Sequence, residues 1–349
     1  MPYPYPDTVT GPELVAEYAS IIKGKTILTT GVSPNTLGAT YVESIAAGQP
    51  KLIILAGRSP DKVKQTAELV AKAHPEVKTR VLELDLTLFA SVRKAADEVN
   101  SWGDVPVIDV LMNNAGIMAV PYEMCVDGFE KQFTANHLGH FLFTNLILDK
   151  ILAANGGRVV NISSGAHYIS GIRHADINFD VSRERKSEGV GHTYVPLVSV
   201  HHHKSKMKEA KGTYAQSKTA NILFSRELAK RLGGRGLLSF SANPGAIGTT
   251  NLTAHLDFSP GKDAEETWRV SRMGGAPYGW QIPELISPER GVSSHVFASF
   301  DPVLKAHNGA YIEQRARIAD YYVDCVSPAA ISDIEAGKLW TLSAKAVGL

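Results

Sequence analysis

Seven short apolar runs alternate with segments of helical periodicity along this chain, and that alternation limits the folds open to it. The runs span residues 26–30, 51–56, 80–84, 108–112, 158–163, 237–242 and 309–313, and helices are expected over 13–22, 60–73, 88–102, 128–153 and 214–232. The run 51–56 is almost wholly apolar, as in strands buried on both faces of a parallel sheet. Strands separated by helices predict an α/β fold, a doubly wound parallel sheet of about seven strands with helices on both faces. Ligands of such sheets bind beyond the carboxyl ends of the strands, so the site is expected there.

The composition argues against several classes of protein. The chain has 349 residues, of which 44% are hydrophobic and 20% charged, as in a soluble globular protein with a sizeable core. A formal net charge of +1 gives no reason to expect nucleic acid or an acidic membrane surface as partner. The cysteines, Cys125 and Cys325, suggest neither a disulfide framework nor a cysteine-based zinc site. No apolar run reaches the roughly 18 residues of a membrane span, and residues 1–7 do not read as a secretion signal, so a cytoplasmic location is expected.

Tyr214 and Lys218 stand four residues apart in the expected helix over 214–232. Positions i and i+4 of a helix share one face, so the phenol and the ammonium can share a site. A free tyrosine has a pKa of about 10, and a nearby cation favours its phenolate. Such a tyrosine could exchange a proton with an alcohol oxygen. The spacing alone also fits an amphipathic helix with an ordinary exposed lysine.

Glycines follow the first expected strand, at Gly31 and Gly38. Between a strand and a helix, glycines let backbone N–H groups approach a pyrophosphate, whose charge the helix N-terminus favours. The middle glycine of the usual fingerprint is absent: Asn35 and Thr36 stand there, in a turn about one residue longer. Asparagine tolerates left-handed backbone geometry, so the turn can survive. A plain glycine turn is the alternative.

Arg58 follows the second expected strand, 20 residues beyond Gly38. Sites that prefer NAD usually hold an acid near this position, but no Asp or Glu lies between residues 52 and 60. A guanidinium suits a 2′-phosphate, so the sequence favours NADP; the alternative is an ordinary surface arginine. After the third strand, Asp85 could meet an adenine ring or begin a turn.

The motifs, taken together and in order, resemble those of the classical short-chain dehydrogenase/reductase family. They are Thr30-Gly31, Asp85-Leu86, residues 113–116 (Asn-Asn-Ala-Gly), Asn136, Ser163-Ser164, Tyr214 with Lys218, and Pro244-Gly245. Residues 136–141, 160–164 and 217–224 resemble its retinol-dehydrogenase-like and WW-domain-oxidoreductase-like branch, without a WW domain. The tail, at residues 308–312 and 338–343, resembles fungal-type members and suggests secondary metabolism. The resemblance covers about residues 24–345.

The resemblance implies a Rossmann-type fold and a role for each matched residue. Tyr214 would be the general acid in reduction and the base in oxidation, and Lys218 would lower its pKa and hold the nicotinamide ribose. Ser164 would donate a hydrogen bond to the substrate oxygen, and Asn136 would hold a water of a proton relay. The cofactor, NADP(H), would be bound by Tyr214 and Lys218 together with Gly31, Leu37, Gly38, Arg58, Asp85, Asn114, Ile247 and Thr249.

The resemblance also implies one domain over residues 1–349. An arm and short helix would occupy residues 1–23, a cofactor-binding half 24–160, and a catalytic and substrate-binding half 161–349. Ser164 and Tyr214 are 50 residues apart, far more than in most members, so a loop is expected to be inserted at about 180–211. It could be a lid or an oligomer contact.

Histidine clusters invite a metal interpretation, which the sequence does not favour. Residues 201–203 are all histidine, and His137 lies near His140, but no carboxylate or cysteine spacing accompanies them. The family chemistry needs no metal, so none is expected. Trp268, Tyr278 and Trp280 could line an apolar pocket or simply pack in the core.

The function expected is that of an NADP(H)-dependent oxidoreductase interconverting a ketone or aldehyde and an alcohol on a small, apolar metabolite. The alternative, from another class, is a catalytically silent dinucleotide-binding sensor or scaffold. A complete set of Ser164, Tyr214, Lys218 and Asn136 argues against it, because a binding module needs no relay. A nucleotide-sugar epimerase or dehydratase shares the Tyr-Lys spacing but is disfavoured by residues 113–116 and the serine pair. Assembly as a homo-oligomer is left open.

Overall fold

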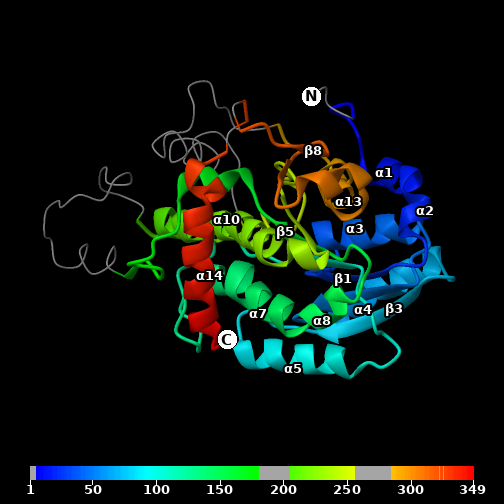
Figure 1. The fold of residues 1–349 in the computed structure, drawn as a ribbon, viewed down its shortest axis with the longest axis horizontal. Coiled ribbons are helices and arrows are strands. Elements are labelled where there is room, and N and C mark those ends of the chain that lie inside the picture. The colour runs from blue at the N-terminus through cyan, green and yellow to red at the C-terminus, as the bar shows by residue number, and fades with distance from the viewer. Residues whose placement is uncertain (1–4, 181–204, 256–283, 322, 325) are drawn as a thin grey trace, which may run out of the picture.

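A parallel sheet runs through the centre of the computed structural model, which describes residues 5–180, 205–255, 284–321, 323–324 and 326–349 (Figure 1). In the described residues it has eight strands: β1 Thr26–Thr30, β2 Leu52–Gly57, β3 Lys78–Glu83, β4 Val110–Asn113, β5 Arg158–Ile162, β6 Leu238–Ala242, β7 Tyr311–Glu313 and β8 Arg317–Ile318. Their order is β3-β2-β1-β4-β5-β6-β7-β8. From β1 the chain adds strands toward one edge of the sheet, and from β4 it adds them toward the other edge. Doubly wound sheets bind their ligands at this switch point between β1 and β4. The predicted fold class is confirmed.

β8 is the addition to the expected sheet. It pairs antiparallel with β7 through Ile312 opposite Ile318 and Glu313 opposite Arg317. The turn between them places Arg315 and Ala316 at φ of 72° and 53°. A strand of two residues leaves no periodic pattern in a sequence, so it was not predicted.

Helices cover both faces of the sheet (Figure 1). One apolar core lies under α1 Gly11–Glu17, α3 Leu37–Ala46, α4 Pro60–Ala73 and α13 Ser293–Phe300. The other lies under α5 Phe89–Ser101, α7 Gly139–Leu146, α8 Leu148–Leu152, α10 Ser205–Leu232 and α14 Asp333–Val347. Successive strand residues point to opposite faces: Ile27 belongs to the first core and Leu28 to the second.

Short elements connect these helices and strands. They are α2 Ala19–Ile22, α6 Lys131–Phe133, η1 Thr134–Leu138, η2 Gly165–Ile169, η3 Gly233–Arg235, α12 Pro288–Gly291, η4 Pro302–His307 and η5 Pro328–Ile331. Thr10 caps α1 in a reciprocal capping box with Glu13, which explains why that helix begins at Gly11.

Three expected helices differ in the structure. The one over 13–22 is two helices, α1 and α2, with Tyr18 between them in a non-helical conformation. The long helix over 128–153 is α6, a π-helical turn η1, α7 and α8, because the wider turn at Thr134–Leu138 interrupts the α-helical hydrogen bonding. Helix α10, expected over 214–232, begins at Ser205, nine residues before Tyr214, and so includes the end of the segment expected as an inserted loop at about 180–211.

Several predictions fall on residues that the structure does not describe. Most of the predicted insertion (181–204), His201, His202 and His203 lie outside the described residues, as do Trp268, Tyr278 and Trp280.

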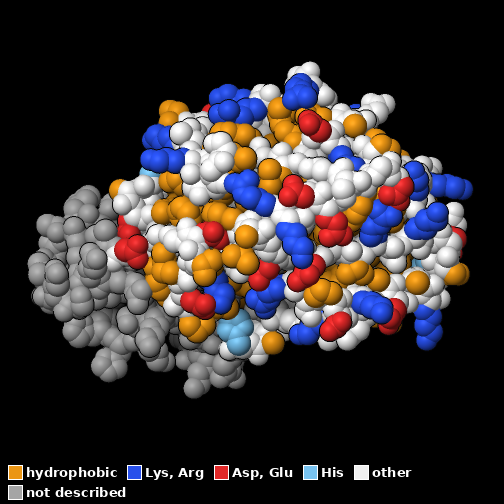
Figure 2. Space-filling view, turned by 90° about the horizontal axis from the view of Figure 1, so that it is seen from below, with side chains coloured by type: hydrophobic (Ala, Val, Ile, Leu, Met, Phe, Trp, Pro, Cys, Tyr) orange, Lys and Arg blue, Asp and Glu red, His pale blue; other side chains and the backbone are white. Residues whose placement is uncertain are grey.

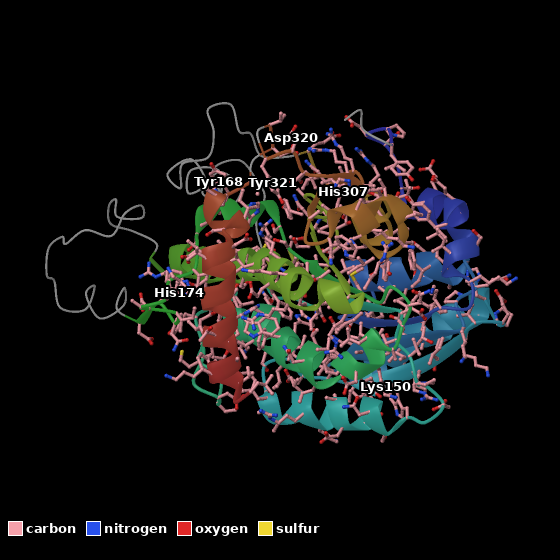
Figure 3. The ribbon with its side chains drawn as sticks, in the orientation of Figure 1. Lys150, Tyr168, His174, His307, Asp320 and Tyr321 are labelled. Atoms are coloured by element: carbon pink, nitrogen blue, oxygen red, sulfur yellow. The ribbon has the colours of Figure 1, made fainter. Side chains whose placement is uncertain are left out.

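Charges of both signs are interspersed over the face of the molecule shown in Figure 2, between scattered apolar side chains. That agrees with the net charge of +1 and shows no broad patch of one sign on this face. Figure 3 shows Lys150 near α5, and His174 beside α14, where its Nε2 lies 2.8 Å from a carboxylate oxygen of Glu335. Within the described part of the chain, no helix is both long enough and apolar enough to cross a membrane.

Candidate active site

Helix α10 places Tyr214 and Lys218 one turn apart at the carboxyl edge of the sheet. The two residues are 5% and 4% exposed, so they are not the exposed pair of an amphipathic helix. Lys218 Nζ lies 5.4 Å from the centre of the Tyr214 ring and donates a hydrogen bond to the Ile162 carbonyl at 2.9 Å. The lysine is therefore fixed between the tyrosine and the end of β5.

Ser164 meets this pair despite the 50 residues that separate it from Tyr214. It follows β5, caps η2 by accepting from Ala166 N at 3.2 Å, and hydrogen-bonds the Tyr214 side chain. Its neighbour Ser163 donates to the Lys218 carbonyl at 2.8 Å. Strand β5 and helix α10 are thus joined next to Ser164, Tyr214 and Lys218.

Burial sets the protonation of the pair. It raises the pKa of Tyr214 to about 12, against a smaller lowering by the Ser164 hydrogen bond, and lowers the pKa of Lys218 to about 8. The resemblance implied that Lys218 lowers the pKa of Tyr214, but here its Nζ faces the Ile162 carbonyl and the ring face. The phenol is therefore protonated at neutral pH, as a proton donor must be.

Asn136 lies on the π-helical turn η1, completely buried. Its Nδ2 donates to the Ile117 carbonyl and to Ser217 Oγ, each at 2.9 Å, and its Oδ1 accepts from Ile117 N at 2.8 Å. A Cβ added at the exposed Gly116 would lie 3.3 Å from Asn136 Oδ1 and 3.4 Å from Lys218 Nζ. The structure therefore brings the Asn136 amide and the Lys218 ammonium close to the same exposed glycine.

The turn after β1 is built for close approach of the backbone. Gly31 has φ of 72°, and a Cβ at Gly38 would lie 2.4 Å from the Gly31 carbonyl oxygen. Asn35 has φ of 60°, so the substitution for glycine is accommodated in the left-handed region as expected. Thr36 caps α3, accepting from Ala39 N at 3.2 Å. Turn and helix N-terminus together fit a pyrophosphate.

Asn114 braces this turn. Its Nδ2 donates to the carbonyls of Thr30 at 2.8 Å and Gly31 at 3.2 Å. Because two carbonyls fix the orientation of the amide, Oδ1 must be the atom that faces His295 Nε2 at 3.2 Å. Each polar atom of the Asn114 side chain is thus engaged within the protein, and the residue holds the glycine turn at Gly31.

Arg58 and Asp85 lie at the ends of neighbouring strands. Arg58 is exposed just after β2, beside Ser59, the N-cap residue of α4, whose side chain makes no capping hydrogen bond. Asp85 accepts from Thr87 N at 2.9 Å and from Thr87 Oγ1 at 2.6 Å, which is the turn that the sequence allowed. The structure thus places Arg58 at the surface and Asp85 in a turn.

The loop after β6 closes over the glycine turn. Ile247 and Leu37 come within 3.0 Å and 3.4 Å of the point where a Gly291 Cβ would lie, and Thr249 is exposed. Asn251, which sequence reasoning missed, donates from its N to the Asn35 carbonyl at 3.0 Å and from its Nδ2 to the Pro34 carbonyl at 2.9 Å. The predicted residues from both halves of the chain therefore share one edge of the sheet.

His137 and His140 do not form a metal pair. His137 Nε2 lies 2.8 Å from Ser343 Oγ of α14, and His140 Nε2 lies 2.9 Å from Thr30 Oγ1. Among the described residues, no group of three or more His, Cys, Asp or Glu could hold a metal ion.

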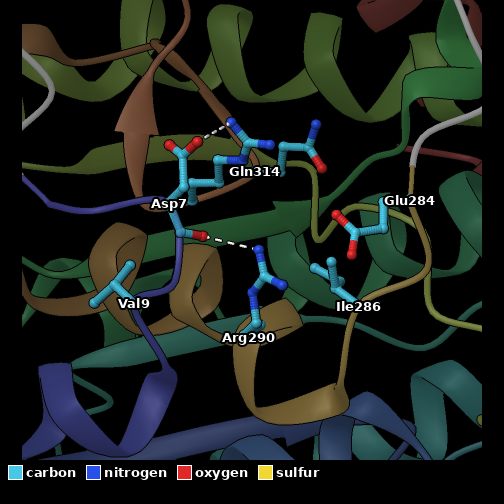
Figure 4. Close-up of a pocket in the computed structure, with 7 residues that line it drawn as sticks. Asp7, Val9, Glu284, Ile286, Arg290 and Gln314 are labelled. Atoms are coloured by element: carbon cyan, nitrogen blue, oxygen red, sulfur yellow. Dashed lines mark hydrogen bonds and ion pairs between the residues drawn. The ribbon is translucent and has the colours of Figure 1, made fainter.

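Two hollows lie away from these residues. Figure 4 shows one of about 110 Å³, where Arg290 donates to the Asp7 carbonyl at 2.9 Å and Arg315 to its carboxylate at 2.8 Å. The other, about 800 Å³, is lined by Phe129, Ile177, Gly337, Lys338, Thr341, Leu342, Lys345 and Ala346. Neither is lined by Ser164, Tyr214, Lys218 or Asn136.

Comparisons show what the chain is similar to. The family model described as short chain dehydrogenase matches residues 25–174. Retinol dehydrogenase 13 of Homo sapiens is 30% identical over 343 residues, 98% of this chain and 90% of that protein. A solved structure described as a putative uncharacterized protein from Mycobacterium paratuberculosis is 28% identical, with a TM-score of 0.62 over 95% of this chain and 97% of that one. The NADPH-bound carbonyl reductase from chicken fatty liver, 17% identical, shares the fold with a TM-score of 0.56 over 86% of this chain and 100% of that one.

Proposed function

The chain belongs to the short-chain dehydrogenase/reductase family, in its retinol-dehydrogenase-like branch, and from this premise we propose that it is an NADP(H)-dependent oxidoreductase. It interconverts an aldehyde or ketone and an alcohol on a small, apolar metabolite. The observation that carries the proposal is the cluster at the carboxyl edge of the sheet that joins buried Tyr214, Lys218 and Asn136 with half-buried Ser164.

The mechanism assigns proton handling to these side chains. The dinucleotide, when bound, supplies or accepts the hydride. In reduction, the Tyr214 phenol gives its proton to the substrate oxygen, while the Ser164 hydroxyl donates a hydrogen bond to that oxygen and stabilises its developing charge. In oxidation, Tyr214 must first lose its own proton, and its phenolate oxygen then takes the proton of the alcohol. Lys218 and the backbone around Asn136 hold the water that returns the proton to solvent.

The residues proposed to hold the dinucleotide fit that group. Gly31 and Gly38 allow the backbone to approach a pyrophosphate, and Gly116 is exposed next to Lys218. The full proposed set is Gly31, Leu37, Gly38, Arg58, Asp85, Asn114, Tyr214, Lys218, Ile247 and Thr249.

The preference for NADP(H) rests on Arg58. Its exposed guanidinium at the end of β2 suits a 2′-phosphate, and a fold neighbour is described as NADPH-bound. Arg58→Ala should weaken NADPH binding by about tenfold to a hundredfold, the value of one charge-assisted contact, and leave NADH binding unchanged. Titrations following NADPH fluorescence measure this, with Lys51→Ala at the other end of β2 as control. Tighter binding of NADH than NADPH by the unmodified protein would contradict the preference.

The activity is tested by incubating the protein and NADPH with a panel of aldehydes and ketones while absorbance is followed. Oxidation of NADPH that depends on one class of carbonyl supports the proposal. Tight NADPH binding without turnover of any carbonyl, or of any alcohol with NADP, would favour the silent sensor or scaffold.

We also propose one domain over residues 1–349, since strands from both halves of the chain share one sheet. A cytoplasmic location and a role in secondary metabolism stay predictions from the sequence.

A further inference from the structure

His140 is a buried titratable residue that the proposed chemistry does not use. It lies on α7, 1% exposed, four residues after Asn136. Burial lowers its pKa to about 3, helped by the nearby Lys218 charge and opposed by a hydrogen bond with the Asn136 backbone. The ring is therefore neutral, with one nitrogen that donates and one that accepts.

The partners of Thr30 decide which nitrogen carries the proton. Thr30 Oγ1 accepts from Asn114 N and from Ala115 N, each at 3.0 Å, which uses both of its lone pairs. Its own hydrogen must then be donated. His140 Nε2 lies at 2.9 Å and the Met112 carbonyl at 3.5 Å, so Nε2 is the better acceptor.

The other ring nitrogen reaches the relay. With Nε2 accepting, the proton lies on Nδ1, which is 3.2 Å from the Asn136 carbonyl oxygen and donates to it. The His140 ring thus contacts two parts of the site. Its Nε2 accepts from the Thr30 hydroxyl, which holds the backbone of Asn114 and Ala115, and its Nδ1 donates to the backbone carbonyl of Asn136.

We propose that His140 is a positioning residue that couples the cofactor-binding turn to the proton relay. Its Nε2 orients the Thr30 hydroxyl, and through it the backbone around Asn114 that lies against Gly31. Its Nδ1–H holds the Asn136 carbonyl. The effect on turnover rests on the proposed function, whereas the effect on dinucleotide binding does not.

Asparagine and glutamine separate the two halves of this role, because the asparagine amide lies near the position of Nδ1 and the glutamine amide near that of Nε2. His140→Asn should keep the donor to Asn136 and lose the acceptor for Thr30. Its Kd for NADPH should rise about tenfold, equivalent to about 1.4 kcal/mol, with kcat nearly unchanged. His140→Gln should bind NADPH within about twofold of the parent and lose about tenfold in kcat.

Thr30→Val provides a matched partner. It removes the hydroxyl with all of its hydrogen bonds, so adding His140→Asn to Thr30→Val should weaken NADPH binding little further, because the hydrogen bond between the two residues is already lost. Equal losses of binding and turnover in the Asn and Gln variants would overturn the proposal, because a merely structural histidine would give that result.

A direct measurement needs no variant. Labelling the histidine rings with ¹⁵N and recording their nitrogen resonances in the whole protein identifies the tautomer; we expect Nδ1–H for His140. A proton on Nε2 would overturn the assignment. Turnover is followed with NADPH and para-nitrobenzaldehyde: if the parent protein reduces no carbonyl, the proposed function fails, while NADPH binding and the tautomer still decide the role of His140.

Discussion

The floor of the candidate site, defined as residues 30–38 and 113–117, and the C-terminal helices α13 and α14 contribute to that site in different ways. The floor is dictated by the backbone: a side chain at Gly38 would collide with the Gly31 carbonyl. The C-terminal helices contribute side chains: His295 of α13 contacts Asn114, and Ser343 of α14 contacts His137. His137 is the neighbour of Asn136, whose side chain contacts Ile117 of the floor. A buried histidine therefore takes part in the contact of each helix, His295 for α13 and His137 for α14.

This difference predicts at which positions amino-acid substitutions should be tolerated. Steric requirements of a turn allow almost no substitution, whereas a single side-chain hydrogen bond contributes about 1 kcal/mol and can be lost with modest effect. The histidines between the two regions form a third category, because their neutrality depends on the pH.

Lowering the pH should have the largest effect on stability, because it acts on the buried histidines. Burial lowers the pKa of His137, His140 and His295 to about 3 and that of His167 to about 4, below the usual 6.5. Between those values the unfolded chain binds more protons, so the free energy of unfolding falls as the pH drops below 6.5, by up to about 1.4 kcal/mol per pH unit for each histidine. Urea unfolding at pH 7 and pH 5 measures this. The free energy of unfolding of His140→Gln should decrease less between pH 7 and pH 5 than that of the parent. Equal stability of the parent at both pH values would contradict the assignment of neutral buried rings.

Gly38→Ala should have the next largest effect, since its Cβ would lie 2.4 Å from one backbone atom and 2.5 Å from Asn114 Nδ2. Overpacking of this kind costs about 2 kcal/mol, and a displaced turn should weaken NADPH binding about thirtyfold. The control is Gly103→Ala, where no atom lies within 4 Å of the added Cβ. Undiminished NADPH binding by Gly38→Ala would break the contrast between floor and helices.

Ser343→Ala should have the smallest effect. It removes the 2.8 Å partner of buried His137 Nε2, at a cost of about 1 kcal/mol in the free energy of unfolding. Thr341→Ala on the exposed face of α14 should stay within about 0.5 kcal/mol of the parent. If the two variants lose equal stability in urea unfolding, α14 does not act through Ser343.

The sequence predicted the floor better than the helices that support it. The bounds of β1 were predicted correctly, and the left-handed Asn35 was anticipated, because strand patterning and turn chemistry are local. The π-helical turn η1 was missed because its side-chain spacing is close to that of an α-helix. His295 was missed because its contact with Asn114 joins residues 181 apart, and no local pattern marks such a contact.

The central claim is that Tyr214 delivers the proton, and Tyr214→Phe tests it most directly. The variant keeps the buried ring and the neighbouring Lys218 and removes only the phenol oxygen. Turnover of NADPH with the best carbonyl of the panel should fall by at least about a hundredfold, the value of a general acid, while the Kd for NADPH stays within about twofold. A Tyr214→Phe enzyme that turns over like the parent would show that the proton comes from another group.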